Sequence, residues 1–107
     1  MKQSEVLTAL SALSQASRLR VFRKLVAAGP AGSTPSEIAR RLKVTPATLS
    51  FHLKELLNAG LVTQERSGRS LIYRADYGRM HRLLSYLTEN CCQQPPASGH
   101  DPQACEC

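Results

Sequence analysis

All four cysteines of this chain lie within its last 17 residues, in the segment CCQQPPASGHDPQACEC. Cys91 and Cys92 are adjacent, and Cys105 and Cys107 are separated by one residue. In a reducing compartment, clustered thiols are more often metal ligands or redox sensors than structural disulfides. The spacing therefore predicts a ligand-binding or sensing segment at the end of the chain, and the elements before it must explain what that segment controls.

Length and hydropathy limit the class of protein. A chain of 107 residues has the size of one domain with a single modest core. It has no 18-residue apolar run, and no charged start followed by an apolar stretch. We therefore expect a cytoplasmic protein with no membrane association.

The charge is unevenly distributed. The net charge is +6, and all 14 lysines and arginines lie between Lys2 and Arg82. The segment from Cys91 onward contains Asp101 and Glu106 but neither lysine nor arginine. A basic body of this kind suits a polyanion such as DNA, and a solvated basic surface is the alternative interpretation.

Two helices are predicted before residue 30. The first spans residues 4–14, and the second begins at Ser17 and is stopped by Gly29 and Pro30. Their apolar faces are predicted to hold Val6, Leu7, Leu10 and Leu13 in the first helix, and Leu19, Phe22, Leu25 and Val26 in the second.

Two capping signals predict a helix-turn-helix. Thr34-Pro35 with Glu37 forms a capping box, so a short helix should follow and run to about Leu42. The Thr-Pro pair at residues 45–46 repeats the signal and opens a helix that ends at Gly60. Two short helices joined by a tight turn are typical of this motif.

The next segment predicts a β-hairpin followed by a helix. Strand-like runs flank a turn at Ser67-Gly68-Arg69, and a last helix from Asp76 to about Asn90 places Met80, Leu83, Leu84 and Leu87 on one stripe. The predicted fold is mainly α with a small β-hairpin, a winged helix-turn-helix. Residues 1–90 would form the DNA-binding and dimerisation domain, and residues 91–107 a flexible cysteine-rich, metalloid-binding tail.

A chain with these predicted elements resembles a known family, the ArsR/SmtB metalloregulatory repressors. The resemblance lies in LSQASRLRVFRKLV at residues 13–26 and in residues 36–76, above all in LSFHLKELLNAGLV with the following GR and Tyr. It covers roughly residues 5–90. It implies a homodimeric DNA-binding repressor, not an enzyme, that releases its operator on binding a metal or metalloid ion.

The second helix of the motif should lie in the major groove. Its core stripe is Leu49, Leu53, Leu56 and Leu57, and His52 falls on the same side, as a packed, hydrogen-bonded residue rather than a base contact. The arginines Arg18, Arg20 and Arg23 of the preceding helix form either a solvated face or phosphate contacts. The predicted DNA-binding residues are Thr45, Ala47, Thr48, Ser50, Phe51 and Lys54 on the motif, and Arg66 and Arg69 at the hairpin tip.

Two sensing sites common in the family are absent from this sequence. The first motif helix contains no cysteine, and the zinc-type site on the last helix retains Asp76 but has Gly78 where a histidine would stand. The thiols remain, and some arsenic repressors of the family carry such a vicinal pair just after the last helix. Trivalent arsenic or antimony prefers three sulfurs, which Cys91, Cys92 and either Cys105 or Cys107 would supply. Paired thiols alone would also suit methylarsenite.

Assembly and alternatives complete the expectations. Apolar surface in excess of what a small core needs predicts a homodimer through the first and last helices, which would bind an inverted-repeat operator. The alternative sensors are a disulfide switch, in which Cys91 or Cys92 pairs with Cys105 or Cys107, and a site for another soft metal ion. A thiol arsenate reductase is disfavoured because the sequence has no Cys-x5-Arg run and no glycine-rich anion loop.

Overall fold

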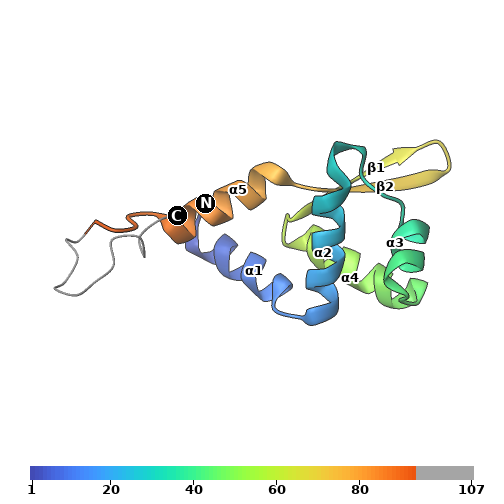
Figure 1. Cartoon of the computed structure of the whole chain (residues 1–107), viewed down its shortest axis with the longest axis horizontal. Coiled ribbons are helices and arrows are strands. Elements are labelled where there is room, and N and C mark those ends of the chain that lie inside the picture. Colours follow the sequence, from blue (N-terminus) through green and yellow to red (C-terminus); the bar gives the residue numbers. More distant parts are fainter. Residues whose placement is uncertain (94–107) are drawn as a thin grey trace.

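The computed structural model describes residues 1–93, and the remaining residues, 94–107, are outside the described part of the chain. The predicted fold class is confirmed: a mainly helical winged helix-turn-helix with one two-stranded hairpin (Figure 1). In chain order the elements are α1 (Gln3–Leu13), α2 (Ala16–Ala28), a 3-10 turn (Gly29–Ala31), α3 (Pro35–Leu42), α4 (Pro46–Asn58), β1 (Val62–Ser67), β2 (Ser70–Ala75) and α5 (Tyr77–Thr88).

The predicted caps begin both helices of the motif. The Thr34 hydroxyl accepts a hydrogen bond from the backbone N–H of Glu37, 3.3 Å away, before α3. The return bond of the predicted capping box is not made within residues 1–93, where the Glu37 carboxylate accepts instead from Arg41 Nε at 3.0 Å. The Thr45 hydroxyl accepts from the N–H of Thr48 at the same distance before α4. Each cap is followed by proline at the first helical position, where a missing N–H costs nothing. Lys43, with φ of 56°, ends α3 in the left-handed conformation and makes the turn tight.

The core lies where α2, α3 and α4 meet the start of β1. Its largest fully buried side chains come from these four elements or their edges: Val21, Leu25, Ile38, Leu49, Leu53, Leu56 and Leu61. Burial of each such side chain favours folding by about 1.5–3 kcal/mol. This core fixes the buried face of α4 and therefore determines which of its residues face outward.

The hairpin is attached to the body at its base. β1 and β2 pair antiparallel from Val62↔Ala75 to Ser67↔Ser70, so the loop consists of Gly68 and Arg69 only, and Ser67 belongs to β1. Gly68 has φ of 61°, as the first central position of a type II′ turn requires.

A short bridge that the sequence did not predict adds a third piece of extended chain. Ser33 exchanges two backbone hydrogen bonds with Tyr73, of 2.9 and 2.8 Å. Gly32 makes this approach possible because a Cβ there would lie 2.6 Å from the Tyr73 carbonyl oxygen, and its φ of 70° disfavours any other residue. The bridge ties β2 to the segment that leads into α3.

The predicted apolar faces of α1 and α2 are divided between the core and the surface of the subunit. The structure buries Val6, Ala9 and Ala12 of α1, while Leu7 and Leu10 are 58% and 38% exposed. In α2, Leu19 is also exposed, although Phe22 and Leu25 are buried as predicted. Small alanines let α1 approach its neighbours closely, and the larger leucines are left outside the subunit core.

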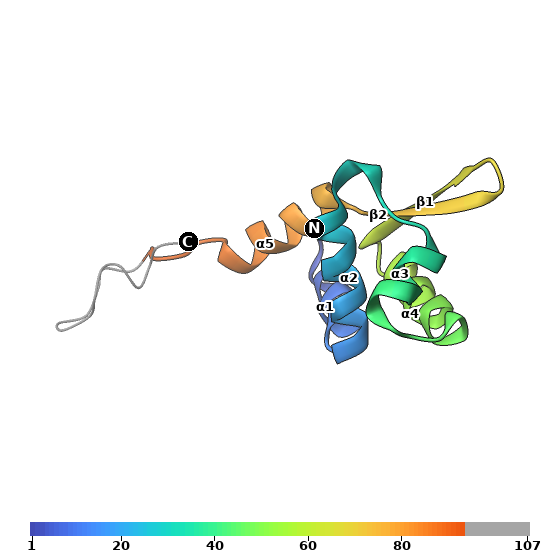
Figure 2. The ribbon, with the colours of Figure 1, turned by 45° about the vertical axis from the view of Figure 1, so that its right-hand side comes forward.

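Helix α5 leaves the body of the molecule along its length (Figure 2). Leu83 is buried, whereas Leu84 and Leu87 are both 53% exposed. Near its start, Arg79 makes an ion pair of 3.2 Å with Glu5 of α1. None of the helices in residues 1–93 combines the length and apolar character that a membrane span requires.

Candidate nucleic-acid interface and thiol site

The outward face of α4 carries every residue that the sequence assigned to it. Thr45, Ala47, Thr48, Ser50, Phe51 and Lys54 are all exposed, whereas Leu49, Leu53 and Leu56 are buried. Leu57, predicted to lie in the core, is half-buried at its edge. The structure therefore presents a mixed polar and apolar helix face to solvent, and contact of these side chains with DNA remains a prediction.

Thr45 and Thr48 are joined to each other at the start of this face. Besides capping the helix, the Thr45 hydroxyl donates to the Thr48 hydroxyl over 2.8 Å. The capping role takes up hydrogen-bonding capacity of Thr45, so Thr48, Ser50 and Lys54 are the more available polar groups. Sequence reasoning identified both threonines but not the bond between them.

His52 is buried beneath the face, as predicted, but without the expected hydrogen bond. Only 4% of it is exposed, and its Nδ1 has no hydrogen-bond partner within residues 1–93. Burial, and secondarily the positive charge of Arg18, lowers the pKa of the His52 imidazole below its ordinary value of 6.5. The imidazole is therefore held in its neutral form and belongs to the core side of α4.

The hairpin tip carries Arg66 and Arg69, both exposed. At the other end, Arg74 of β2 donates from Nε to the Pro30 carbonyl over 2.7 Å and pairs with Glu65 at 3.1 Å. These bonds hold the base of the hairpin to the 3-10 turn, so the tip projects from a fixed base (Figure 1). The two tip arginines therefore lie exposed at the far end of an anchored hairpin.

The three arginines of α2 have different environments. Arg20 donates to the Leu42 carbonyl over 3.3 Å, and Arg23 is exposed at the rim of an apolar pocket. The Arg18 side chain is only 15% exposed and pairs with Glu55 of α4 at 3.7 Å. A uniform solvated face, one of the two predicted alternatives, does not describe Arg18.

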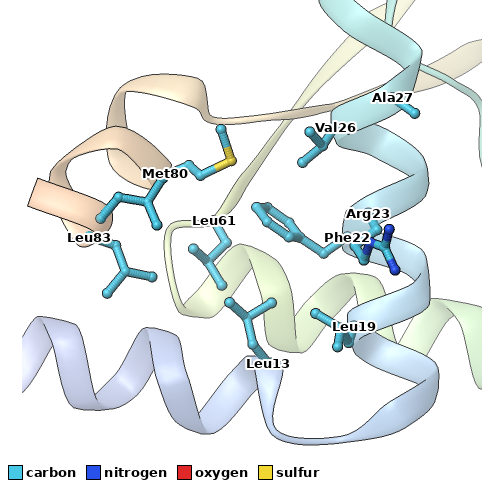
Figure 3. Close-up of a pocket in the computed structure, with 10 residues that line it drawn as sticks. Leu13, Leu19, Phe22, Arg23, Val26, Ala27, Leu61, Met80 and Leu83 are labelled. Carbon is cyan, nitrogen blue, oxygen red and sulfur yellow. The ribbon is translucent and has the colours of Figure 1, made fainter. Parts of the chain in front are cut away.

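The apolar pocket lies between α2, the end of α1 and α5 (Figure 3). Its volume is about 430 Å³. Leu19, Phe22, Met80 and Leu83 point into it from two helices. Leu84 also lines it. The pocket adjoins the exposed Leu84 of α5. The exposed apolar surface of α5 therefore continues onto α2.

The predicted thiol site is described only in part. Cys91 and Cys92 are exposed directly after α5, and their sulfur atoms lie 3.4 Å apart, farther than the roughly 2 Å of an S–S bond between them. The N–H of Cys91 still bonds to the Thr88 carbonyl at 3.0 Å, so the pair begins at the helix end itself. Cys105 and Cys107 lie outside the described residues.

No other cluster of ligating side chains competes with this pair in residues 1–93. Within them, His, Cys, Asp and Glu form no group of three that would hold a metal ion. Asp76, the one remnant of the zinc-type site, accepts from the N–H of Arg79 at 2.9 Å as the N-cap of α5. Its carboxylate thus has a structural task.

An exposed helix of a helix-turn-helix, with a basic hairpin anchored beside it, defines a winged-helix DNA-binding protein. A model of a helix-turn-helix domain matches residues 13–65. The arsenical resistance operon repressor of Bacillus subtilis (strain 168) is 33% identical over 81 residues, which are 76% of this chain and 73% of that protein. The chain belongs to the ArsR family of helix-turn-helix transcriptional regulators, which bind DNA and are not enzymes.

Solved structures agree with this assignment. An ArsR-like transcriptional regulator from Rhodococcus sp. RHA1 is 30% identical, with a TM-score of 0.71 over 78% of this chain and 76% of that one. The homodimeric winged helix-turn-helix DNA-binding domain of Mb0332 from Mycobacterium bovis is 27% identical, with a TM-score of 0.64 and 81% of each chain covered.

Proposed function

We propose that this regulator is a homodimeric repressor that leaves its operator when Cys91, Cys92 and a third thiol, from Cys105 or Cys107, bind trivalent arsenic or antimony. The observation that carries the proposal is the pair of exposed sulfur atoms 3.4 Å apart at the end of α5. Thiolates are the ligands that soft ions prefer. The similarity to an arsenical resistance repressor supports the same inducer.

The chemistry needs only the thiols of the chain and arsenous acid. Each thiol replaces one hydroxyl group on arsenic, so an As–O bond is exchanged for an As–S bond and one water leaves per thiol. Because Cys91 and Cys92 are adjacent, the first two As–S bonds would form without closing a long loop. The third thiol closes a loop of about a dozen residues, whose entropic cost grows only slowly with length. Methylarsenite, with two exchangeable groups, would need only Cys91 and Cys92.

The dimer of the proposal is formed by α1 and α5. Leu7 and Leu10 of α1, with Leu84 and Leu87 of α5, are exposed apolar side chains, and a relative with the same fold is a homodimer. A two-fold dimer presents two copies of α4 to two half-sites of an inverted repeat. Thiols at the end of a dimer helix are then placed where binding of an inducer can change the distance between the two copies of α4.

A connection from α5 to the rest of the subunit is present at Arg79. Its guanidinium pairs with Glu5, and the hydrogen bond from the Lys2 N–H, together with Arg79, holds the pKa of the Glu5 carboxyl below its ordinary value. The same guanidinium lies about 3 Å from where a Cβ on Gly60 would be, at the end of α4. Displacement of α5 would therefore disturb contacts with both α1 and the end of α4. Only a difference in inducer affinity between the free and DNA-bound forms turns this into release.

The test is an arsenite titration of the purified, reduced protein bound to its operator. We expect the parent to leave DNA, with a coupling of about 1–3 kcal/mol between inducer and operator. The Cys91→Ser, Cys92→Ser double variant should bind DNA normally and remain bound. Cys105→Ser and Cys107→Ser test the third position, and the variant with the larger loss of release identifies the third ligand. Release of the double variant at the parent's arsenite concentration would place the sensing site elsewhere.

A second candidate is a redox switch, because the structure holds Cys92 in a disulfide, so Cys91 and Cys92 are both thiols only after reduction. Oxidation of two thiols to a disulfide would reshape the same helix end, with a peroxide or another disulfide as the oxidant. Operator binding measured with and without a dithiol reductant, in the absence of arsenite, separates the candidates. Loss of binding on oxidation, restored by the reductant, would support the redox switch.

A further inference from the structure

We propose that Arg18 of α2 is a positioning residue for sequence reading: it holds the Phe51 ring so that the ring meets the methyl group of one thymine in the major groove. The inference rests on the proposed assignment of the outer face of α4 to DNA. It concerns what that face reads, and not how the protein senses its inducer.

Arg18 reaches from one helix onto another. It lies in the first turn of α2, where the Gln15 side chain accepts from its backbone N–H over 2.7 Å. Its guanidinium carbon lies 5.9 Å from the centre of the Phe51 ring, within the range of a cation–π contact. The same guanidinium pairs with Glu55, one turn further along α4. A planar guanidinium suits this double role better than an ammonium group.

Arg18 is poorly suited to bind phosphate instead. Its side chain is largely covered, its Nε is buried with no hydrogen-bond partner within residues 1–93, and the Glu55 carboxylate offsets its charge. Its guanidinium contacts with Phe51 and Glu55 both run to α4. The reasonable task for such a side chain is to hold something on that helix, and the side chain that it lies over is Phe51.

Phe51 has a second contact that restricts it further. Its ring meets the His52 imidazole edge-on, with centroids 5.9 Å apart and planes inclined by 61°. Phe51 is nevertheless 57% exposed, so much of its surface is open to a partner. A phenyl ring held by two contacts and exposed elsewhere can pack against an apolar group of a partner with little further loss of side-chain freedom. In the major groove the apolar group available is the thymine methyl.

The experiment removes that methyl from DNA one thymine at a time. Each operator duplex carries deoxyuridine, which lacks the methyl group, in place of one thymine. At each position we measure the ratio of the dissociation constant for the deoxyuridine duplex to that for the thymine duplex. We expect one thymine per half-site to show a ratio above one in the parent. The ratio should fall to about one in Phe51→Ala. In Arg18→Met it should fall from the parent value toward one, by at most about two- to fivefold, the range of an exposed cation–π contact.

The matched control is Arg23→Met, which removes the same charge from an exposed position of α2. It should weaken binding to both duplexes by the same factor and leave the ratio of dissociation constants at the parent value. A general electrostatic or stability effect of Arg18→Met would also leave the ratio unchanged, and that result would overturn the inference. Circular dichroism checks that the variants fold. Arg18→Lys, which keeps the charge, replaces Arg18→Met if the latter does not fold, with an intermediate ratio expected.

A second measurement needs no DNA. The chain has two phenylalanines, Phe22 and Phe51, so protein labelled with fluorophenylalanine gives two fluorine resonances, and Phe51→Leu assigns the second. Arg18→Met should shift and sharpen the Phe51 resonance, whereas Arg23→Met should not. An unchanged resonance would overturn the inference, as would a parent ratio of one at every thymine. Neither result touches arsenite-dependent release, which tests the proposed function separately.

Discussion

The outer surface of α4 contains two kinds of polar side chain, those that hold the helix and those that remain available. Thr45 is of the first kind, because its hydroxyl caps the helix and bonds to Thr48. We predict that Thr45→Ala lowers the free energy of unfolding by about 1 kcal/mol, measured by urea denaturation. Thr48→Ala should cost less stability and mainly relax sequence preference in a binding-site selection. An unchanged preference in Thr48→Ala would contradict the assignment of this face.

His52 provides a pH-dependent prediction at the same scale. Its pKa is lowered in the folded state, so the unfolded chain binds a proton first as the pH falls. The stability of the fold should therefore decrease as the pH drops below about 6.5, down to the lowered pKa, and be unaffected by this residue above that range. His52→Leu should show a smaller decrease between pH 7.5 and 5.5 in urea unfolding. An equal decrease would mean that other groups cause it.

Residue roles were predictable where burial alone decides them. The period of α4 separated Leu49, Leu53 and His52 from the exposed positions, and the structure agrees. It did not reveal that Arg18 leaves the solvent to lie over Phe51, because that contact joins residues 33 positions apart and depends on the packing of α2 against α4. Spacing along one helix contains no information about its neighbour.

At the scale of elements, the hairpin is a rigid arm with a charged end. Arg74 and the Ser33–Tyr73 bridge hold its base, while Arg69 occupies the two-residue loop. We predict that Arg69→Ala weakens binding to all DNA sequences and reduces the slope of log affinity against log salt by about one unit. The measurement is a salt titration on operator and random duplexes. Arg40→Ala, on the exposed face of α3, is the control.

Element bounds followed well from caps and breakers. The Thr-Pro pairs, Gly29 and Asp76 are local signals, and the structure begins or ends helices at each of them. The division of the apolar face of α1 between core and surface did not follow. Leucines compete for the subunit core and for any interface, and a pattern of large apolar residues does not say which surface receives them. In α1 the core took Val6 and the alanines.

The whole molecule raises the question of assembly. Leu84 and Leu87 are exposed on α5 beside an apolar pocket. We predict that Leu84→Glu, Leu87→Glu converts a micromolar dimer to a monomer in sedimentation, because carboxylates would have to be buried in the seam. Operator affinity should then fall by about a hundredfold or more, since the two half-sites are no longer engaged together.

Ser85→Glu is the control for this variant, as it adds a carboxylate at an exposed neighbouring position of the same helix. It should remain a dimer and bind the operator. A parent that sediments as a monomer at micromolar concentration would contradict the dimer directly, and with it the inverted-repeat operator.

The way α5 departs from the body has a consequence for how such regulators diversify. Beyond Leu83, Tyr86 is the one half-buried residue up to Cys92, and the others are exposed. The thiols therefore begin where the chain has already completed its core, so residues there are exchanged at little cost to folding. If the proposed thiol site is the sensor, a different set of ligands grafted after Thr88 would give a new inducer with the same operator. Under the proposed function, the fold would separate the choice of chemical signal from the choice of gene, and each could evolve, or be engineered, by itself.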